Sequence, residues 1–357
     1  MCQNILFLSE RDFSTLPVIR SIDRRVFGIF IMGPKASPVR FSRFCRKYFP
    51  YPKYSDTNKN EMLVEYVNAV SSKYAIDVII PLDLDSTLWV TENRYNLKKP
   101  TLPVSNVDVI MRLHNKWELT KILDELSLAY PKTVLVESEA VLIDGLMEFP
   151  FLMKPLDLDS CNGIARISNL VDLDGYRKAQ FEGSVFPVLA QKYIDGYDID
   201  LSLLAVDGKI INSTIQKWVK HGFLEFISSP EIYAIGEKIV AHEKYSGFLH
   251  IDLRVNGGTG EIFVLECNPR AWGTMNASIL TGVDFVSDAV SCVLREPVLN
   301  REMSKETYVT FTEASKMIIK KPWRYWSMSK ISKRDFLIVL SDALVYFLLV
   351  WRIWRKK

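Results

Sequence analysis

The stretch GFLHIDLRVNGGTGEIFVLECNPRAWG, residues 247–273, consists of two apolar-rich runs joined by a glycine-rich turn. This pattern predicts a β-hairpin, because alternating apolar residues favour strands and glycines accommodate tight turns. With the turn centred on Gly258, Asp252 lies opposite Val264 and is a diagonal neighbour of Glu266. Residues of equal parity share a face of a strand pair, so both carboxylates point to the same side.

A third oxygen donor joins these two acids. Asn268 is two residues past Glu266 and therefore points the same way. Two carboxylates and an amide oxygen are hard ligands of the kind that Mg²⁺ prefers, together with phosphate oxygens. Acids are also common on an exposed antiparallel face, but here the flanking residues are apolar and Asn-Pro-Arg follows at once. We therefore predict a metal site at Asp252, Glu266 and Asn268, with Arg270 as a fixed cation beside it.

Composition narrows the kinds of protein that this chain can be. Its 357 residues are 48% hydrophobic and 24% charged, which is enough for two or three packed domains. The net charge of +3 is unevenly divided, because residues 301–357 alone carry 13 Lys or Arg and 5 Asp or Glu. This disfavours a nucleic-acid groove across the body and favours a local contact with a membrane or another anionic surface. Five scattered cysteines without C-x-x-C spacing disfavour a disulfide framework or a zinc site and fit a reducing compartment.

The first hundred residues alternate apolar runs with a helical pattern. Buried parallel strands are predicted at 5–9, 26–32 and 77–81, and apolar residues at helical spacing predict a helix over 60–74. The opening run NILFLS is too short for a secretory signal, so the protein is expected in the cytoplasm. We predict a doubly wound α/β domain over residues 1–110. It lacks the G-x-G-x-x-G pattern of dinucleotide-binding domains.

The middle of the chain, residues 111–300, is predicted to be a mixed α+β domain. A helix begins near residue 114 and is ended by Pro131, and a strand follows it. The other expected elements are strands at 149–155 and 185–194, a hairpin over 198–219 with an Asp-Gly turn, and a helix near 230–245.

The last region, residues 301–357, is a basic and tryptophan-rich helical tail. Its apolar segment, Phe336 to Trp351, is interrupted by Ser341 and Asp342. A spanning helix needs about 20 apolar residues, and an aspartate inside it costs about 2.5–3.5 kcal/mol, so spanning is disfavoured. Two alternatives stay open: an interfacial helix on the inner face of a membrane, and a helix packed on the body of the protein.

The hairpin resembles the metal-binding end of the ATP-grasp superfamily, in which an acid on one strand precedes Glu-x-Asn-Pro-Arg on the next. Three further stretches are similar to parts of that family and stand in its order. They are LHNKWEL (113–119), FPFLMKP (149–155) and LAQKYIDGYDID (189–200). The resemblance covers roughly residues 1–295. It implies that the N-terminal α/β domain precedes a two-lobed ATP-grasp fold.

The resemblance also implies roles for individual residues. Lys116 and Lys154 reach the phosphates of ATP, Asp198 holds the ribose hydroxyls, and Arg270 holds a substrate carboxylate or an acyl phosphate. The residues expected to line adenine, the last two through backbone groups, are Gln191, Lys192 and Ile194. A role for Lys217 at the phosphates is weighed against simple exposure on the long hairpin. Each of the others has a structural alternative, such as Lys154 ending a strand or Asp198 serving turn chemistry.

One segment departs from the family pattern. The glycine-rich loop that follows Lys-Pro in the family reads LDLDSCNGIARI here and holds a single glycine, Gly163. Backbone amides from Ser160 to Gly163 can still cradle phosphate. The two aspartates in this loop would repel a triphosphate unless they point away.

The resemblance implies an ATP-dependent carboxylate–amine ligase that uses ATP and two Mg²⁺ ions, or Mn²⁺ in their place. A carboxylate becomes an acyl phosphate, and an amine then attacks it to form an amide, with release of ADP and phosphate. His221 and His250 are the available candidates for a base. Two other classes of function remain open: another ATP-grasp chemistry, such as carboxylation or thioester formation, and a non-catalytic, membrane-associated ATP-binding protein. The oligomeric state does not follow from the sequence.

Overall fold

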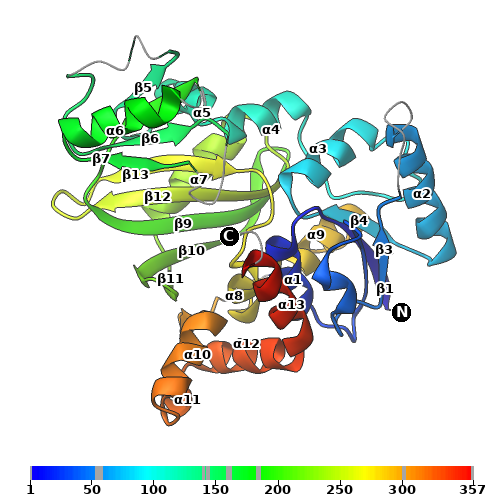
Figure 1. Ribbon diagram of the computed structural model, residues 1–357. Coiled ribbons are helices and arrows are strands. Elements are labelled where there is room, and N and C mark those ends of the chain that lie inside the picture. Colours follow the sequence, from blue (N-terminus) through cyan, green and yellow to red (C-terminus); the bar gives the residue numbers. More distant parts are fainter. Residues whose placement is uncertain are drawn as a thin grey trace.

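The computed structural model describes residues 2–52, 59–138, 141, 145–157, 163–181, 186–299 and 303–354. They form three β-sheets with flanking helices, and two of the sheets face each other at one end of the molecule (Figure 1). The C-terminal helices lie beside the N-terminal sheet and extend away from the two facing sheets (Figure 1). The mixed α/β architecture predicted from the sequence is confirmed.

The N-terminal sheet is parallel throughout, and its strands are joined by crossover connections, two of which contain α-helices. In spatial order its strands are β3 (Lys47–Pro50), β2 (Phe27–Gly33), β1 (Gln3–Leu8) and β4 (Val78–Pro81). The helices of this region are α1 (Asp12–Ser21), α2 (Lys59–Lys73) and α3 (Leu84–Asn93), with a 3₁₀ turn η1 (Pro38–Phe41). The three predicted strands are confirmed. The short edge strand β3 was not predicted, since four residues give little periodicity.

The largest sheet has six antiparallel strands. In spatial order they are β13 (Ile262–Asn268), β12 (Gly247–Asn256), β9 (Gly196–Val206), β10 (Lys209–Lys220), β11 (Phe223–Ile227) and β14 (Thr307–Val309). The predicted Asp-Gly turn between β9 and β10 is confirmed, with positive φ at both Asp207 and Gly208. One face of this sheet is apolar and is covered by α5 (Lys116–Glu125) and α7 (Pro230–His242).

The third sheet is smaller and also antiparallel. Its strands, in spatial order, are β5 (Thr133–Val136), β8 (Val188–Lys192), β6 (Phe151–Pro155) and β7 (Ala165–Ile167), and α6 (Leu170–Phe181) lies on it. This sheet faces the β12–β13 end of the large sheet (Figure 1). The arrangement matches the predicted two-lobed fold.

Two predicted features of the middle region are wrong in detail. The hairpin register differs, because Asp252 pairs with Glu266 and not with Val264. The helix α5 ends at Glu125, before Pro131. Ser127 adopts φ 51°, and the Leu128 amide donates to Leu123 O at 2.9 Å, which closes the helix as a Schellman motif.

The remaining helices connect these sheets and form the C-terminal region. They are α4 (Val107–His114), α8 (Met275–Leu280), α9 (Phe285–Leu294), α10 (Phe311–Lys320), α11 (Arg324–Ser327), α12 (Lys330–Ser341) and α13 (Ala343–Trp354). The predicted apolar segment 336–351 is therefore not one helix, since it is broken at Asp342. No helix among the described residues is both long and apolar enough to cross a bilayer.

The C-terminal helices pack on the N-terminal region. Val345 of α13 is fully buried in the same core as the N-terminal strands. Asp342 accepts hydrogen bonds from Arg20 Nε at 3.0 Å, Arg20 Nη2 at 2.9 Å, Ser42 Oγ at 2.8 Å and the Arg43 amide at 3.0 Å. The packed alternative thus describes the α12–α13 junction.

Candidate active site

A cavity of ≈ 410 Å³ lies between the large sheet and the small sheet. Its lining brings together carboxylates from β9, β12 and β13 with cations from two other segments. The charged residues are Asp198, Asp200, Asp252, Glu266, Lys154 and Arg270, and His250 and Trp218 complete the polar wall. The acidic side chains and His250 alternate along β9, β12 and β13 with residues of the apolar core, which places them on the face turned toward the small sheet.

The predicted acid pair sits at the centre of this wall. Asp252 and Glu266 are direct cross-strand partners, because a bulge leaves Leu265 unpaired and shifts the register on one side of it. Burial and the neighbouring Asp252 charge raise the pKa of Glu266. Two carboxylates that face each other while largely buried favour a shared cation.

Asn268 lies between the two acids, as predicted, but its amide is turned the other way. Its Nδ2 donates to Asp252 Oδ2 at 2.9 Å and to Glu266 Oε1 at 3.3 Å, while Oδ1 accepts from Arg270 Nη2 at 3.2 Å. A half-turn of the amide exchanges oxygen and nitrogen and would direct the oxygen toward the space between the carboxylates.

This donor set fits Mg²⁺. Two carboxylates and one amide oxygen, all on one face of a rigid hairpin, supply the hard oxygen ligands that the ion prefers. A second grouping within the described residues, Asp200, His250 and Asp252, has ligand atoms within 4.8 Å of one another. Both nitrogens of its histidine already have protein partners, so the carboxylate–amide set suits a hard cation better.

Lys116 is held beside this set by the start of α5. The helix is capped by Asn115 Oδ1, which accepts from the amides of Trp117 and Glu118. The buried Lys116 ammonium lies 3.1 Å from Glu266 Oε2. The structure therefore joins the predicted phosphate-binding lysine to a predicted metal ligand.

His250 is a residue that the sequence analysis named only as a base. Its Nε2 lies 3.2 Å from Asp252 Oδ1 and 4.0 Å from Asp200 Oδ2, and its Nδ1 lies 2.8 Å from Ser202 Oγ. The ring also stacks on Trp272, with centroids 5.8 Å apart. Since both ring nitrogens are engaged, His250 orients Asp252 and is not free to act as a base.

The charges around His250 shift several pKa values. Burial disfavours the imidazolium, but the Asp252 and Asp200 carboxylates outweigh it and raise the pKa of His250. Burial would likewise raise the pKa of Asp252, yet the neighbouring imidazolium lowers it to about 2. Burial raises the pKa of Asp200 to about 7.

Asp200 and Trp218 were missed by the sequence analysis. Trp218 Nε1 donates to Asp200 Oδ2 at 2.7 Å, and both line the cavity. The sequence did contain a partial signal for Asp200, because it lies two residues after Asp198 and therefore points to the same face of the strand. What the sequence does not show is that β9 pairs with β12, which comes much later in the chain.

Lys154 enters the cavity from the small sheet, as predicted. Its side chain is buried, with 5% of the residue exposed, and Nζ donates to Gln191 Oε1 at 2.7 Å. Gln191 Nε2 in turn donates to Thr133 Oγ1 at 3.1 Å. These contacts fix a buried ammonium at the wall of the cavity, where an anion would be strongly favoured.

The predicted adenine segment follows directly. Lys192 turns its side chain outward to Glu148, 3.4 Å away, and Ile194 is buried. Among the described residues, no acceptor is found for the Ile194 amide. The predicted ribose ligand Asp198 pairs with Arg254, whose Nε also donates to Ile194 O at 2.6 Å. Arg254 was not anticipated.

The structure does not place the predicted ATP ligand Lys217 in the cavity. Lys217 pairs across the strands with Ile199, whose side chain is in the apolar core, so Lys217 points to the opposite face and lies 4.4 Å from the Tyr197 ring. Lys217 therefore does not face the cavity where phosphate was expected to bind. Ser160 lies outside the described residues. Gly163 is described and has φ 73°, a conformation that favours glycine.

Arg270 is buried beneath the acids. Its Nη1 donates to Ala271 O at 3.0 Å and its Nη2 to Asn268 Oδ1. The guanidinium is thus fixed at the cavity wall, as predicted, at the end of β13.

Comparisons with known proteins agree with this geometry. Residues 184–316 match the family described as "ATP-grasp in the biosynthetic pathway with Ter operon". The carbamoyl phosphate synthase large chain of Thermoanaerobacter sp. (strain X514) is 30% identical over 196 residues, which cover 50% of this chain and 18% of that one. The chain thus spans about a fifth of the length of that relative.

Two solved structures show the same fold. The L-amino acid ligase from Bacillus licheniformis has a TM-score of 0.59 at 16% identity, over 82% of this chain and 73% of that one. The biotin carboxylase domain of the Hydrogenobacter thermophilus 2-oxoglutarate carboxylase, in complex with MgADP, ADP and bicarbonate, has a TM-score of 0.61 at 15% identity. That match covers 86% of this chain and 73% of the other. The facing sheets, the ordered motifs and these matches agree: the chain has the ATP-grasp fold, and residues 184–316 match an ATP-grasp family.

Proposed function

We propose that this protein is an ATP-dependent ligase that activates a carboxylate as an acyl phosphate for attack by an amine. The observation that carries the proposal is the convergence on one cavity of buried cations, Lys154 and Arg270, with the opposed carboxylates of Asp252 and Glu266. A binding site for a neutral ligand would not need both cations and carboxylates. A site that transfers the terminal group of a polyphosphate needs cations for the phosphates and carboxylates for the metal ion.

ATP is proposed to lie between the two sheets. The amide of Ile194, which has no acceptor among the described residues, would donate to adenine, and Asp198 would accept from the ribose. Lys154 would contact the phosphates from the small sheet and Lys116 from the start of α5. Asp252, Glu266 and Asn268 would hold Mg²⁺, which supplies charge neutralisation on the phosphate chain when bound.

The proposed reaction has two steps. An oxygen of the substrate carboxylate attacks the γ-phosphorus of ATP, and the bond from that phosphorus to the bridging oxygen breaks, releasing ADP. The amine nitrogen then attacks the carbonyl carbon of the acyl phosphate, the bond from carbon to the phosphate oxygen breaks, and phosphate leaves. The amine proton goes to the departing phosphate, because His250 is held by Ser202 and Asp252.

The residues of this chain would mainly position and neutralise. Arg270 is fixed by Asn268 and the Ala271 carbonyl, so its guanidinium is preorganised for a carboxylate or an acyl phosphate. His250 fixes the direction of the Asp252 carboxylate. The partners under this proposal are a small carboxylic acid and a small amine, and the proposed place of reaction is the cytoplasm. The four cysteines in the described part of the chain are free thiols, in keeping with a reducing compartment.

The test is ADP release from the purified full chain with Mg²⁺-ATP, screened against paired pools of amino acids and small carboxylates. Turnover that needs an acid and an amine together is the expected result. Glu266→Gln should abolish it, whereas Glu261→Gln, an exposed acid of the same hairpin, should leave it unchanged.

Other outcomes would contradict the proposal. ADP release that requires bicarbonate and needs no second acid would indicate carboxylation. Tight ATP binding without turnover in any pool, in a protein whose Glu266→Gln variant binds ATP equally well, would indicate a binding protein.

A further inference from the structure

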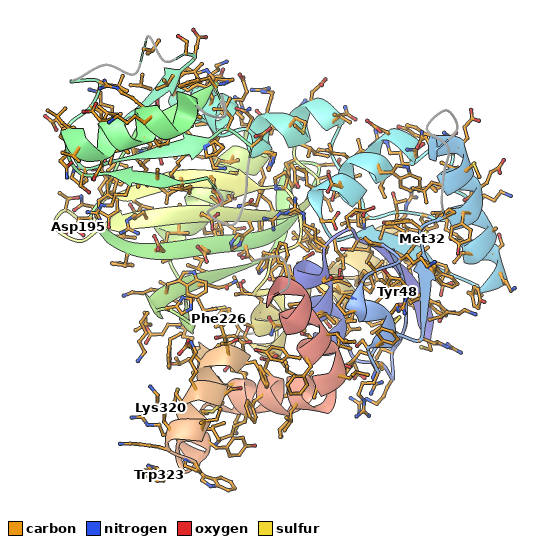
Figure 2. The ribbon with its side chains drawn as sticks, in the orientation of Figure 1. Met32, Tyr48, Asp195, Phe226, Lys320 and Trp323 are labelled. Atoms are coloured by element: carbon orange, nitrogen blue, oxygen red, sulfur yellow. The ribbon has the colours of Figure 1, made fainter. Side chains whose placement is uncertain are left out.

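The corner formed by α10, α11 and the start of α12, residues 316–334, extends away from the rest of the molecule. Figure 2 shows Lys320 and Trp323 at its outer end, away from the small sheet and from the β12–β13 end of the large sheet. None of the cavity-lining residues comes from this corner. Its properties are therefore not explained by the proposed reaction.

Large apolar side chains are exposed on this corner. Ile319 is 82% exposed, Trp323 66% and Trp326 77%. Single exposed apolar residues are normal on soluble proteins, but two tryptophans and an isoleucine within eight residues form a group. Tryptophan favours the boundary between water and lipid, because its ring is apolar and its N–H is polar.

The same corner is strongly basic. Residues 316–334 contain no Asp or Glu, and their basic residues are Lys316, Lys320, Lys321, Arg324, Lys330, Lys333 and Arg334. Lys316 is paired with Glu313 at 2.7 Å. Within the part of the chain that the structure describes, Lys320, Lys321 and Arg324 form no ion pair. Their charge is available for an external anion.

The exposed side chains are held in place from below. Tyr325 and Met328 turn inward and pack in a small core with Phe336. Lys333 Nζ donates to Trp326 O at 2.8 Å, and Ser329 caps α12 through the Ser332 amide. The corner is thus a built element of the fold that presents its tryptophans outward.

We propose that this corner docks the protein on an anionic membrane surface. Trp323, Trp326 and Ile319 would enter the interfacial layer, while Lys320, Lys321 and Arg324 would contact lipid phosphates. Charge complementarity favours an anionic bilayer, since residues 316–334 contain no acid and only Lys316 of their basic residues is ion-paired within the described part of the chain. The inference goes beyond the proposed ligase activity and does not depend on it.

This proposed membrane-binding site lies elsewhere in the chain than the apolar segment considered from the sequence. The sequence left two alternatives open for the tail that holds the apolar segment 336–351, an interfacial helix and a packed helix. In the structure, Asp342 and Val345 of that segment are buried against the N-terminal region. The outward-facing combination of tryptophan and lysine lies earlier in the chain, in the corner.

The test is co-sedimentation of the full chain with vesicles. One set contains phosphatidylcholine and phosphatidylglycerol in equal parts, and the other contains phosphatidylcholine alone. Binding is expected to the anionic set only. Each neutralised lysine should weaken binding about fivefold, so the double variant Lys320→Gln/Lys321→Gln should bind about 25-fold more weakly. Trp323→Ala/Trp326→Ala should weaken it at least about tenfold.

A matched control is available elsewhere on the surface. Tyr95 is 87% exposed and is followed by Lys98 and Lys99. The triple variant Tyr95→Ala/Lys98→Gln/Lys99→Gln removes one aromatic ring and two positive charges outside the corner, and it should bind vesicles as the unmodified protein does. ATP binding by all variants shows that they are folded, because the corner is remote from the cavity.

Three results would overturn the proposal. One is equal binding to both vesicle sets, and another is equal loss in the control and corner variants. The third is self-association that the tryptophan variant abolishes, without vesicle binding by the unmodified protein, which would make the corner an interface between copies of this chain.

Discussion

The junction between α12 and α13 provides a sharp test of how the C-terminal helices are held. Asp342 and Arg20 form an ion pair at 2.9 Å, with side chains 3% and 7% exposed. The same carboxylate also accepts from Ser42 Oγ and from the Arg43 amide. Asp342→Ala removes the carboxylate and leaves a buried guanidinium, a hydroxyl and an amide without this acceptor.

Removing one partner of a buried ion pair costs about 3–5 kcal/mol, because the remaining charge stays desolvated. The loss falls on the contact between the C-terminal helices and the N-terminal region. Hydrogen exchange resolves this locally, through the free energy of opening at each amide. Amides of α13 should exchange at least about a hundredfold faster in Asp342→Ala, since about 1.4 kcal/mol corresponds to a factor of ten.

The matched control is Ser341→Ala, which changes the adjacent exposed residue whose hydroxyl bonds only to Ile338 O of its own helix. Exchange in α13 should then stay at the level of the unmodified protein. The reasoning would be refuted by an Asp342→Ala variant whose α13 amides remain protected. It would also be refuted if the control variant loses protection to the same degree.

Three further predictions follow from single contacts. Lys154→Met should weaken ATP binding about 10-fold to 100-fold in titration calorimetry, because it removes a charge-assisted contact of about 1.5–3 kcal/mol. The control Lys178→Met, which changes an exposed lysine, should bind ATP as the unmodified protein does. Equal affinities of the two variants would contradict the proposed placement of ATP. Burial raises the pKa of Asp335, so the folded state binds more protons than the unfolded state above the ordinary value of 3.8. The stabilisation from proton binding at Asp335 is fully present below pH 3.8 and is lost as the pH rises through the pKa of the folded state. Asp335→Asn should therefore flatten this part of the plot of urea midpoint against pH. Gly196→Ala should lower the urea midpoint of unfolding, because the φ of Gly196 is 155° and an added Cβ would meet Val255 O. The control Gly260→Ala, also at positive φ but in open space, should lower the midpoint less. Equal losses in the two variants would show that the close approach to Val255 is unimportant.

Parity explains why the metal-binding face could be predicted although the register could not. The predicted pairing placed Asp252 opposite Val264, and the observed partner is Glu266, two residues further along. The shift is two residues on the Asp252 side of the bulge, which keeps the side chains there on their faces, and it is one residue beyond the bulge, where Leu253 pairs with Val264. The face of Asp252, Glu266 and Asn268 was therefore secure despite an unforeseen bulge.

A bulge had the opposite effect on Lys217. From the tight turn between β9 and β10, uninterrupted pairing would place Lys217 opposite Asp198, on the cavity face. The irregularity between Ile210 and Asn212 shifts the register by one residue, so Lys217 pairs with Ile199. The sequence carries no marker of that bulge.

The structural role of Asp342 depends on a partner that is distant in the sequence. In the sequence, Asp342 is only an interruption of an apolar segment. In the structure it receives a guanidinium from Arg20, 322 residues earlier, and becomes the anchor of the C-terminal helices.

Sequence alone determined the elements whose signals are local. These are the apolar runs of the N-terminal strands, the Asp-Gly turn, the lysine before Pro155, and the acids of the hairpin, together with the order of motifs that resembles the ATP-grasp family. Tertiary structure decided which strands became neighbours, and so it joined Asp200 and Trp218 to His250 and turned Lys217 away. Local periodicity encodes the direction of a side chain relative to its own strand. Pairing between distant strands, and the bulges within it, are set by packing of the whole chain, which no short window of sequence contains.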